Sequence, residues 1–204
     1  MIGSDPQAVD PSFVTGLVLA AGGSKRLGQP KQLLAYGDGT LLDHTLDTAR
    51  ACRFDQSLCV IGGGAEGVRD EVDLVGFEVV VNEAFGEGCS SSIAAAIAAV
   101  DPRAGTLVLM LGDQPGVTAA AVEALVEGRG EAPMAVCEYE DGRGHPLAFD
   151  RSVFVDLTQL HGDKGVWRLM DRLGETVATV PVAGPIPLDV DTWEDYERVL
   201  AARA

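Results

Sequence analysis

Short apolar runs alternate with segments of helical periodicity along almost the whole chain. Most of these runs are continuous rather than alternating apolar with polar residues, as expected for strands that are covered on both faces. They predict six strands, at residues 15–20, 58–61, 78–81, 106–111, 134–137 and 176–180. Because strands and helices alternate, we expect βαβ units and a mostly parallel central sheet.

Apolar residues recur at helical spacing between these strands. The stripes are Leu42, Leu46 and Ala49 with Cys52 or Arg53, then Ile93, Ile97 and Val100, then Val122, Leu125 and Val126. A last helix is predicted to begin after Thr192, because Asp195 follows at the spacing of a capping box. Its Trp193, Tyr196 and Leu200 share one face, which we expect to pack against the sheet.

A length of 204 residues suits one α/β domain, and no linker or repeat divides the chain. We expect residues 1–12 to be a disordered leader and residues 13–204 to form the domain. The leader contains Asp5 and Asp10 but no Lys or Arg, so it lacks the basic region of a signal peptide. No apolar run approaches the roughly 20 residues that cross a bilayer. The four cysteines form no metal-binding or disulfide pattern. These features predict a cytoplasmic protein with reduced thiols and no membrane partner.

The first loop carries a cluster of positive charge in an otherwise acidic chain. The chain has 15 basic and 31 acidic residues and a net charge of -16, which disfavours a nucleic-acid partner. Only three lysines occur, and two of them, Lys25 and Lys31, flank Arg26 in the glycine-rich segment after the first strand. Small residues there allow backbone N–H groups to turn toward a ligand. The segment therefore predicts an anion site, although a solvated turn is the alternative.

Two common phosphate-binding motifs are absent from this loop. Gly23 and Gly28 have the outer spacing of a P-loop, but Gln29 and Pro30 stand where Lys and Ser or Thr are required. No G-x-G-x-x-G pattern can be read there either. Residues 19–31 instead resemble the signature of the MobA/MocA-like nucleotidyltransferases, L-A-(A/G)-G-x-S-x-R-x-G-x-x-K, at every specified position.

The resemblance implies a Rossmann-like three-layer α/β/α sandwich, similar to the nucleotide-diphospho-sugar transferases. It also implies that Arg26 and Lys31 are catalytic cations that neutralise the triphosphate and the departing pyrophosphate. The nucleotide would be bound by the loop residues Leu19, Ala20, Ala21, Gly22, Gly23, Ser24, Lys25, Arg26 and Lys31.

Carboxylates at two further positions are candidates for a metal site. Asp113 follows the strand at residues 106–111, at the sheet edge expected for the glycine loop. Asp189 and Asp191 would share one face of an extended segment. Mg²⁺ is usually held by one or two carboxylates together with substrate phosphates. A turn at Asp113 and a helix cap at Asp191 are the alternatives, whereas the resemblance implies Mg²⁺ binding by Asp113 and Asp191.

Residues 82–92 follow another predicted strand and carry serines that are natural helix caps. The family shows an N-x-x-W-x-x-G-x-x-S-S segment here, which implies nucleotide-binding roles for Asn82, Gly88 and Ser91. Phe85 replaces the usual Trp. Cys89 has acidic neighbours that disfavour a thiolate, so we do not expect it to be a nucleophile.

Two polar glycine loops, residues 142–146 and 162–165, are candidates for the acceptor side, although ordinary surface turns are the alternative. The resemblance implies that corresponding segments line a pterin site. The expected acceptor-binding residues are Gln114, Pro115, Gly144, His145, Pro146 and Lys164.

Together these inferences predict a transferase that moves CMP from CTP to a phosphorylated pterin, the molybdenum cofactor, and releases pyrophosphate. Ala21 favours cytidylyl transfer, because guanylyl-transferring relatives carry Leu-Ala-Gly-Gly at this place. Guanylyl transfer, nucleotidyl transfer to a sugar phosphate or phospholactate, and a non-catalytic cofactor-binding chaperone are the alternatives. A client molybdoenzyme is a candidate partner.

Overall fold

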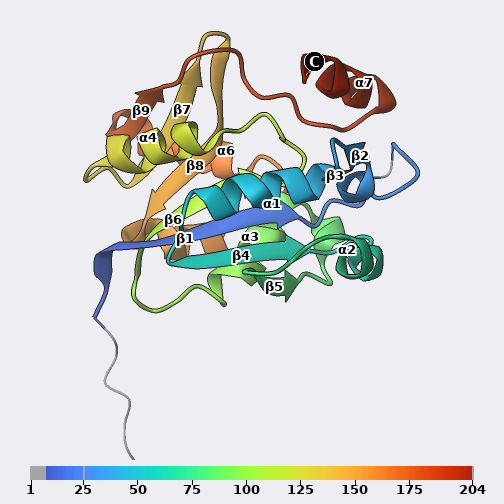
Figure 1. Ribbon diagram of the computed structural model, residues 1–204. Helices are drawn as coiled ribbons and strands as arrows, with labels where there is room; N and C mark the ends of the chain where they lie inside the picture. Colours follow the sequence, from blue (N-terminus) through green and yellow to red (C-terminus); the bar gives the residue numbers. More distant parts are fainter. Residues whose placement is uncertain (1–7, 25, 204) are drawn as a thin grey trace, which may run out of the picture.

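Strand β1 (Asp10–Ala20) lies near the centre of a seven-stranded sheet in the computed structural model, which describes residues 8–24 and 26–203 (Figure 1). The strand order is β5-β4-β1-β6-β8-β7-β9. Only β8 runs antiparallel to its neighbours. The other strands are β4 (Gln56–Ile61), β5 (Glu78–Val81), β6 (Ala104–Leu111), β7 (Met134–Tyr139), β8 (Gly142–Asp150) and β9 (Val177–Pro181). The six predicted strands and the mostly parallel sheet are confirmed.

Side chains of β1 alternate between two hydrophobic cores, as the pleat of a strand requires. Leu17 and Leu19 join the core beneath α3 (Cys89–Ile97), α5 (Phe154–Thr158) and α6 (Gly165–Leu173). Val18 and Ala20 join the core beneath α1 (Leu41–Ala51), α2 (Ala65–Glu71) and α4 (Ala119–Arg129). Helices thus cover both faces of the sheet, and the predicted three-layer α/β/α architecture is confirmed.

Strand β8 contains residues that we expected to form a polar loop. Gly144 and Pro146 lower strand propensity and hide this element in the sequence. The structure accommodates Pro146 at an irregularity, because Val136 of β7 pairs with Leu147 whereas the next residue, Cys137, pairs with Gly144. The ladder to β6 begins only at Leu147. Reversal of β8 places its amino-terminal end beside the carboxyl end of β6.

The predicted leader, residues 1–12, overlaps the first strand. Asp10 belongs to β1, where its backbone N–H donates to the carbonyl of Arg103 at 2.8 Å and it pairs with Ala104. The Asp10 carboxylate accepts hydrogen bonds from the backbone and hydroxyl of Ser12. Residues 10–12 are therefore ordered by pairing that the sequence pattern does not reveal, and residues 1–7 lie outside the described residues.

Helix α7 (Trp193–Ala202) does not close the domain against the sheet, contrary to our expectation. It packs beside the small hairpin of β2 (Ala35–Tyr36) and β3 (Gly39–Thr40), which follows η1 (Lys31–Leu33) (Figure 1). Its buried residue is Val199, whereas Trp193 is 48% and Leu200 is 38% exposed. The third core contains Leu27, Leu34, Tyr36, Leu41, Val190 and Val199.

The predicted capping box at the start of α7 is confirmed. The Thr192 hydroxyl accepts from the backbone N–H of Asp195, whose carboxylate accepts from the backbone N–H of Thr192. This cap holds the preceding residue, Asp191, near the first loop. Short 3-10 turns η2 (Phe85–Glu87), η3 (Arg151–Val153) and η4 (Gly174–Thr176) complete the described elements.

Candidate functional site

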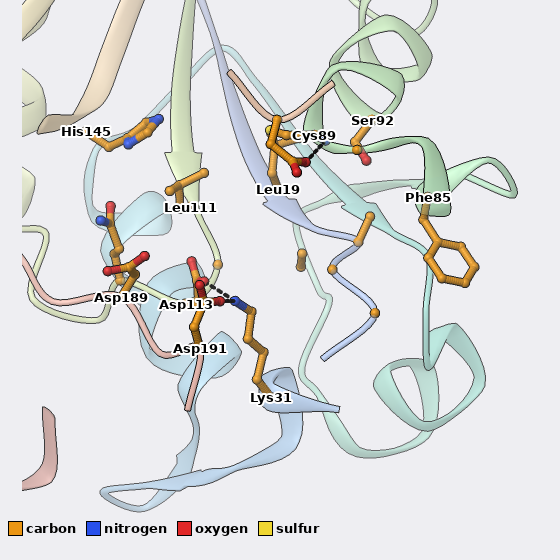
Figure 2. A pocket seen from close by; sticks show the side chains of 18 of the residues that line it. Leu19, Lys31, Phe85, Cys89, Ser92, Leu111, Asp113, His145, Asp189 and Asp191 are labelled. Atoms are coloured by element: carbon orange, nitrogen blue, oxygen red, sulfur yellow. Dashed lines mark hydrogen bonds and ion pairs between the residues drawn. The ribbon is translucent and has the colours of Figure 1, made fainter. Parts of the chain in front are cut away.

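A cavity of about 800 Å³ opens where β1 and β6 end (Figure 2). Parallel α/β sheets bind ligands outside the carboxyl ends of their strands, so the cavity has the expected place. It is lined by most of the predicted site residues: Leu19, Ala20, Ala21, Gly22, Gly23, Ser24, Arg26, Lys31, Gly88, Asp113, Gln114, Gly144, His145 and Asp191. Segments far apart in the sequence therefore contribute to one hollow.

The loop after β1 is held by its own side chains. The Ser24 hydroxyl accepts a hydrogen bond from the backbone N–H of Lys31 at 2.9 Å. Buried Gln32 donates to the carbonyls of Ala20 and Gly22 at 2.6 and 3.1 Å. These contacts fold the loop back on itself, so that Lys31 is directed toward the end of β6. Lys25, which we expected to bind nucleotide, lies outside the described residues.

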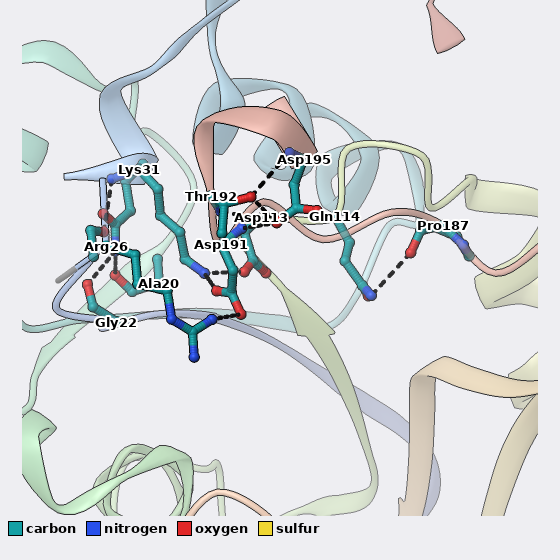
Figure 3. Close-up of polar contacts among 12 residues, drawn as sticks. Ala20, Gly22, Arg26, Lys31, Asp113, Gln114, Pro187, Asp191, Thr192 and Asp195 are labelled. Carbon is teal, nitrogen blue, oxygen red and sulfur yellow. Dashed lines mark hydrogen bonds and ion pairs between the residues drawn. The ribbon is translucent and has the colours of Figure 1, made fainter. Parts of the chain in front are cut away.

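Lys31 stands between two carboxylates that come from opposite parts of the chain (Figure 3). Its ammonium forms an ion pair with Asp113 and lies 2.8 Å from Oδ1 of Asp191. Arg26 reaches the same Asp191 carboxylate at 3.5 Å. The side chains of Lys31 and Asp113 are only 14% and 16% exposed, compared with 50% for Asp191. The predicted cationic loop is therefore neutralised by acidic groups in this structure.

Burial and the neighbouring carboxylates together set the proton affinities of Lys31 and Asp113. Burial opposes the charge of Lys31, but Asp113 and Asp191 raise its pKa above the ordinary value. Burial raises the pKa of Asp113; Lys31 opposes this effect, and Asp189 and Asp191 add to it. The carboxylates therefore decide the direction for Lys31, whereas burial is the largest cause for Asp113. Three carboxylates, those of Asp113, Asp189 and Asp191, stand against the cations Lys31 and Arg26 in this cluster. Such a cluster favours an additional cation.

A divalent cation fits the donor set at this place. One oxygen of Asp113 and one of Asp191 converge on a single point, which the Lys31 ammonium occupies in place of a metal ion. Carboxylate oxygens are the ligands that Mg²⁺ prefers, and the ion commonly takes only one or two of them from the protein. Among residues 8–24 and 26–203, no cluster of three or more His, Cys, Asp or Glu side chains is arranged for a metal. A metal held by Asp113 and Asp191 would complete its coordination with water or with substrate oxygens.

Asn82 and Ser91, which we expected to bind nucleotide, are not among the residues that line the cavity. The Asn82 amide donates to the hydroxyls of Ser91 and Ser92, both at 2.9 Å, and its carbonyl accepts from the backbone N–H of Ala84. Asn82 is also buried. These bonds shape the segment between β5 and α3, so the structure gives Asn82 a structural role. Gly88, in the same segment, does line the cavity.

Cys89 lines the cavity without the environment of a nucleophile. Burial, followed by the charges of Asp163 and Asp113, raises the pKa of its thiol to about 11. The thiolate is therefore scarce at neutral pH. The acidic neighbours that matter are these two residues, rather than the adjacent glutamates in the sequence.

Three of the six predicted acceptor residues line the cavity and three lie elsewhere. Gln114, Gly144 and His145 line the cavity, whereas Pro115, Pro146 and Lys164 do not. Pro146 is buried in β8, Pro115 lines a second hollow near α7, and Lys164 is exposed before α6. A strand and a helix cap therefore replace the two expected loops.

The His145 ring forms an edge-to-face contact with Trp167, at 5.8 Å between ring centroids. Burial lowers the pKa of His145 to about 4, so the ring is neutral at pH 7. The two rings line this wall of the cavity together with Gly144 and Ile186. The wall is apolar and aromatic and suits a planar heterocycle.

Sequence reasoning missed several residues of the site. Gln32 and Trp167 line the cavity and were not predicted. Asp163, from the candidate acceptor loop, and the exposed Asp189, a candidate metal ligand, line it as well. Trp167 lies on a helix whose apolar residues recur at helical spacing, which indicates a core position rather than a cavity wall. Gln32 has no local signal, because its two acceptors are carbonyls of the preceding loop.

Comparison with known proteins relates this chain to a nucleotide-using family. A family model described as the MobA-like NTP transferase domain matches residues 16–177. A nicotine blue oxidoreductase from Paenarthrobacter nicotinovorans is 32% identical over 201 residues, which cover 94% of this chain and 98% of that protein.

Two crystal structures from mycobacteria are also similar. The Rv0371c homologue from Mycobacterium sp. strain JC1 is 55% identical, with a TM-score of 0.89, over 94% of this chain and 96% of that one. The manganese complex of Rv0371c from Mycobacterium tuberculosis H37Rv is 47% identical, with a TM-score of 0.85, over 94% and 100% of the two chains. In the described part of this chain, no helix has the length and apolar character that a bilayer span requires.

Proposed function

The chain belongs to the MobA-like NTP transferase family of nucleotidyltransferases, and we propose that it transfers CMP from CTP to the phosphate of a pterin molybdenum cofactor, releasing pyrophosphate. The observation that carries this proposal is the convergence of Lys31, Asp113 and Asp191 beside the glycine loop. It brings together a phosphate-binding cation and a carboxylate pair for a divalent metal.

The residues of the chain have separate roles in this reaction. Lys31 and Arg26 bind the triphosphate and stabilise the charge that develops on the leaving pyrophosphate. Asp113 and Asp191 hold the divalent cation, which supplies charge neutralisation at the reacting phosphate. An oxygen of the acceptor phosphate forms the new P–O bond as the bond to pyrophosphate breaks. Because this phosphate is ionised near neutral pH, the site needs no general base.

The aromatic wall supports a flat acceptor. A neutral His145 and the neighbouring Trp167 present ring surface rather than charge. The reduced thiols and a cytoplasmic location remain part of the proposal, as does Mg²⁺ as the metal. The choice of CTP rests on Ala21 alone.

A second candidate function is oxidoreduction, because the 32% identical relative is named a nicotine blue oxidoreductase. Gly62, Gly64 and Gly67 follow β4 and enter α2 with the G-x-G-x-x-G spacing of dinucleotide-binding proteins. However, a Cβ on Gly64 would lie 2.9 Å from Pro30, and one on Gly67 would lie 3.1 Å from Leu33. The first loop thus packs on these glycines, where a dinucleotide would need to approach. The packing of the first loop on these glycines therefore favours nucleotidyl transfer over the second candidate function.

The deciding experiment offers each of the four nucleoside triphosphates, with Mg²⁺ or Mn²⁺, to molybdopterin, sugar-phosphate and phospholactate acceptors. We expect a product whose mass increases by that of a cytidylyl group, together with pyrophosphate. Asp113→Asn should abolish the product, and Asp156→Asn, on an exposed surface ion pair, is the matched control.

Other outcomes of this screen assign the alternatives. A guanylyl product would identify GTP rather than CTP as the nucleotide substrate. A product that contains a sugar phosphate or phospholactate would identify that compound, rather than the pterin, as the acceptor. Pterin binding without pyrophosphate would indicate a chaperone. In a separate assay with NADH or NADPH, oxidation of the nucleotide by a heterocycle, with no transfer product in the screen, would refute the transferase proposal and support the second candidate.

A further inference from the structure

Lys31 occupies the place where a metal held by Asp113 and Asp191 would bind. Its ammonium contacts one oxygen of each carboxylate. Its alkyl chain passes beside Gly22, where an added Cβ would lie 3.6 Å from Cε of Lys31. Figure 2 shows the three charged groups meeting at one point of the cavity wall. The contact is therefore a built feature of the site rather than a chance approach of an exposed lysine.

The Lys31 ammonium and a divalent cation cannot both contact the same oxygens of Asp113 and Asp191. An ammonium has three N–H donors, and two of them are directed at the carboxylates. A divalent cation on the same oxygens would meet a positive charge at contact distance, which is strongly repulsive at a poorly hydrated place. Phosphate oxygens of a nucleotide offer the ammonium an equivalent set of acceptors.

We propose that Lys31 is the resident counter-ion of the Asp113 and Asp191 carboxylates, and that a divalent cation binds them only when Lys31 transfers to a phosphate of the incoming nucleotide. This inference rests on the proposed function, because it assigns the order of events at the same site. Metal and nucleotide then bind as a coupled pair, and each raises the affinity for the other. Arg26 stays on the exposed side of Asp191 and does not block the exchange.

The test measures Mn²⁺ binding without nucleotide by the electron paramagnetic resonance signal of free Mn²⁺. Lys31→Gln and Lys31→Met both remove the charge, and Met also preserves the buried alkyl chain. We expect each variant to bind Mn²⁺ at least tenfold more tightly than the wild type, which corresponds to about 1.4 kcal/mol. Lys164→Gln makes the same change of net charge at an exposed residue outside the cavity and should bind like the wild type.

A double variant tests whether the tighter Mn²⁺ binding depends on Asp113. Asp113→Asn combined with Lys31→Gln should lose the tight Mn²⁺ binding. If the Lys31 variants fold, as judged by circular dichroism, and bind Mn²⁺ no better than the wild type, the proposal is wrong. It is also wrong if the gain survives the loss of Asp113.

Nitrogen NMR of lysine side chains tests the wild type directly, because the chain has only three lysines. Millimolar Mg²⁺ alone should leave the Lys31 ammonium signal unchanged, whereas Mg²⁺ with CTP should shift it. A shift with Mg²⁺ alone would overturn the proposal. If the Lys31 variants gain Mn²⁺ binding but no nucleotide is transferred to any acceptor, the counter-ion role stands and the proposed function fails.

Discussion

Nζ of Lys31 lies 2.8 Å from Oδ1 of Asp191, although the two residues are 160 positions apart. The bond joins the loop after the first strand to the segment before the last helix. Asp191 is held there because Thr192 caps α7 and Val190 is buried in the third core. Closure of the site therefore depends on the carboxyl-terminal helix as well as on the glycine loop.

Removing the Asp191 carboxylate should affect activity more than stability. We expect Asp191→Asn to lower metal-dependent turnover at least tenfold, about 1.4 kcal/mol of transition-state stabilisation. The free energy of unfolding should change by only about 0–1 kcal/mol, because the carboxylate is half exposed. Initial rates and urea denaturation measure the two effects. A variant that keeps wild-type rates at low metal concentration would remove Asp191 from the metal site.

Gln32 should be required for the shape of the first loop. Gln32→Leu leaves the carbonyls of Ala20 and Gly22 without the donor that now joins them. We expect a loss of about 1–3 kcal/mol in unfolding free energy and weaker nucleotide binding, measured by denaturation and calorimetry. Gln159→Leu makes the same change at an exposed residue and serves as the control. Unchanged nucleotide affinity in Gln32→Leu would show that the loop keeps its shape without this brace.

Two glycines of one segment should respond differently to alanine. Gly88 has φ +99°, and a Cβ there would lie 2.8 Å from Oδ1 of Asp163. Gly88→Ala should therefore cost about 1–3 kcal/mol and lower nucleotide affinity. A Cβ on Gly86 would meet nothing within 4 Å, so Gly86→Ala should be close to neutral. Thermal denaturation compares the two variants, and equal midpoints would contradict the steric argument.

His145 should make the fold sensitive to mild acid. Burial lowers its pKa from 6.5 to about 4, so between these values the unfolded chain binds a proton that the folded chain does not. The free energy of unfolding should therefore fall as the pH drops through this window, by at most about 3 kcal/mol. His145→Gln removes this contribution and should flatten the wild-type dependence. Denaturant titrations at pH 7 and pH 4.5 measure the unfolding free energy of both proteins. An equal change between the two pH values in the wild type and in His145→Gln would exclude His145 as a cause.

Local patterns in the sequence were sufficient for the layers of the fold and for the first loop. Continuous apolar runs determined six strands, because a strand covered on both faces has no polar side to display. The cap at Thr192 was equally readable, because its partners are three residues apart. The combination of glycines, Arg26 and Lys31 after β1 indicated an anion site, because a cationic cluster is unusual in a chain of charge -16.

Contacts between distant segments were decided only by the tertiary structure. Strand β8 contains Gly144 and Pro146 and is stabilised by its neighbours rather than by its own propensity. Asn82 belongs to a segment that resembles a nucleotide-binding motif, yet its amide donates its hydrogen bonds to Ser91 and Ser92 of the same segment. The position of Asp113 at the edge of the glycine loop was predicted, but its direct ion pair with Lys31 and that of Asp191 were not. Charge in a sequence does not specify how much water separates two groups or which of several partners is in contact. Burial decides both, and burial is a property of the folded chain.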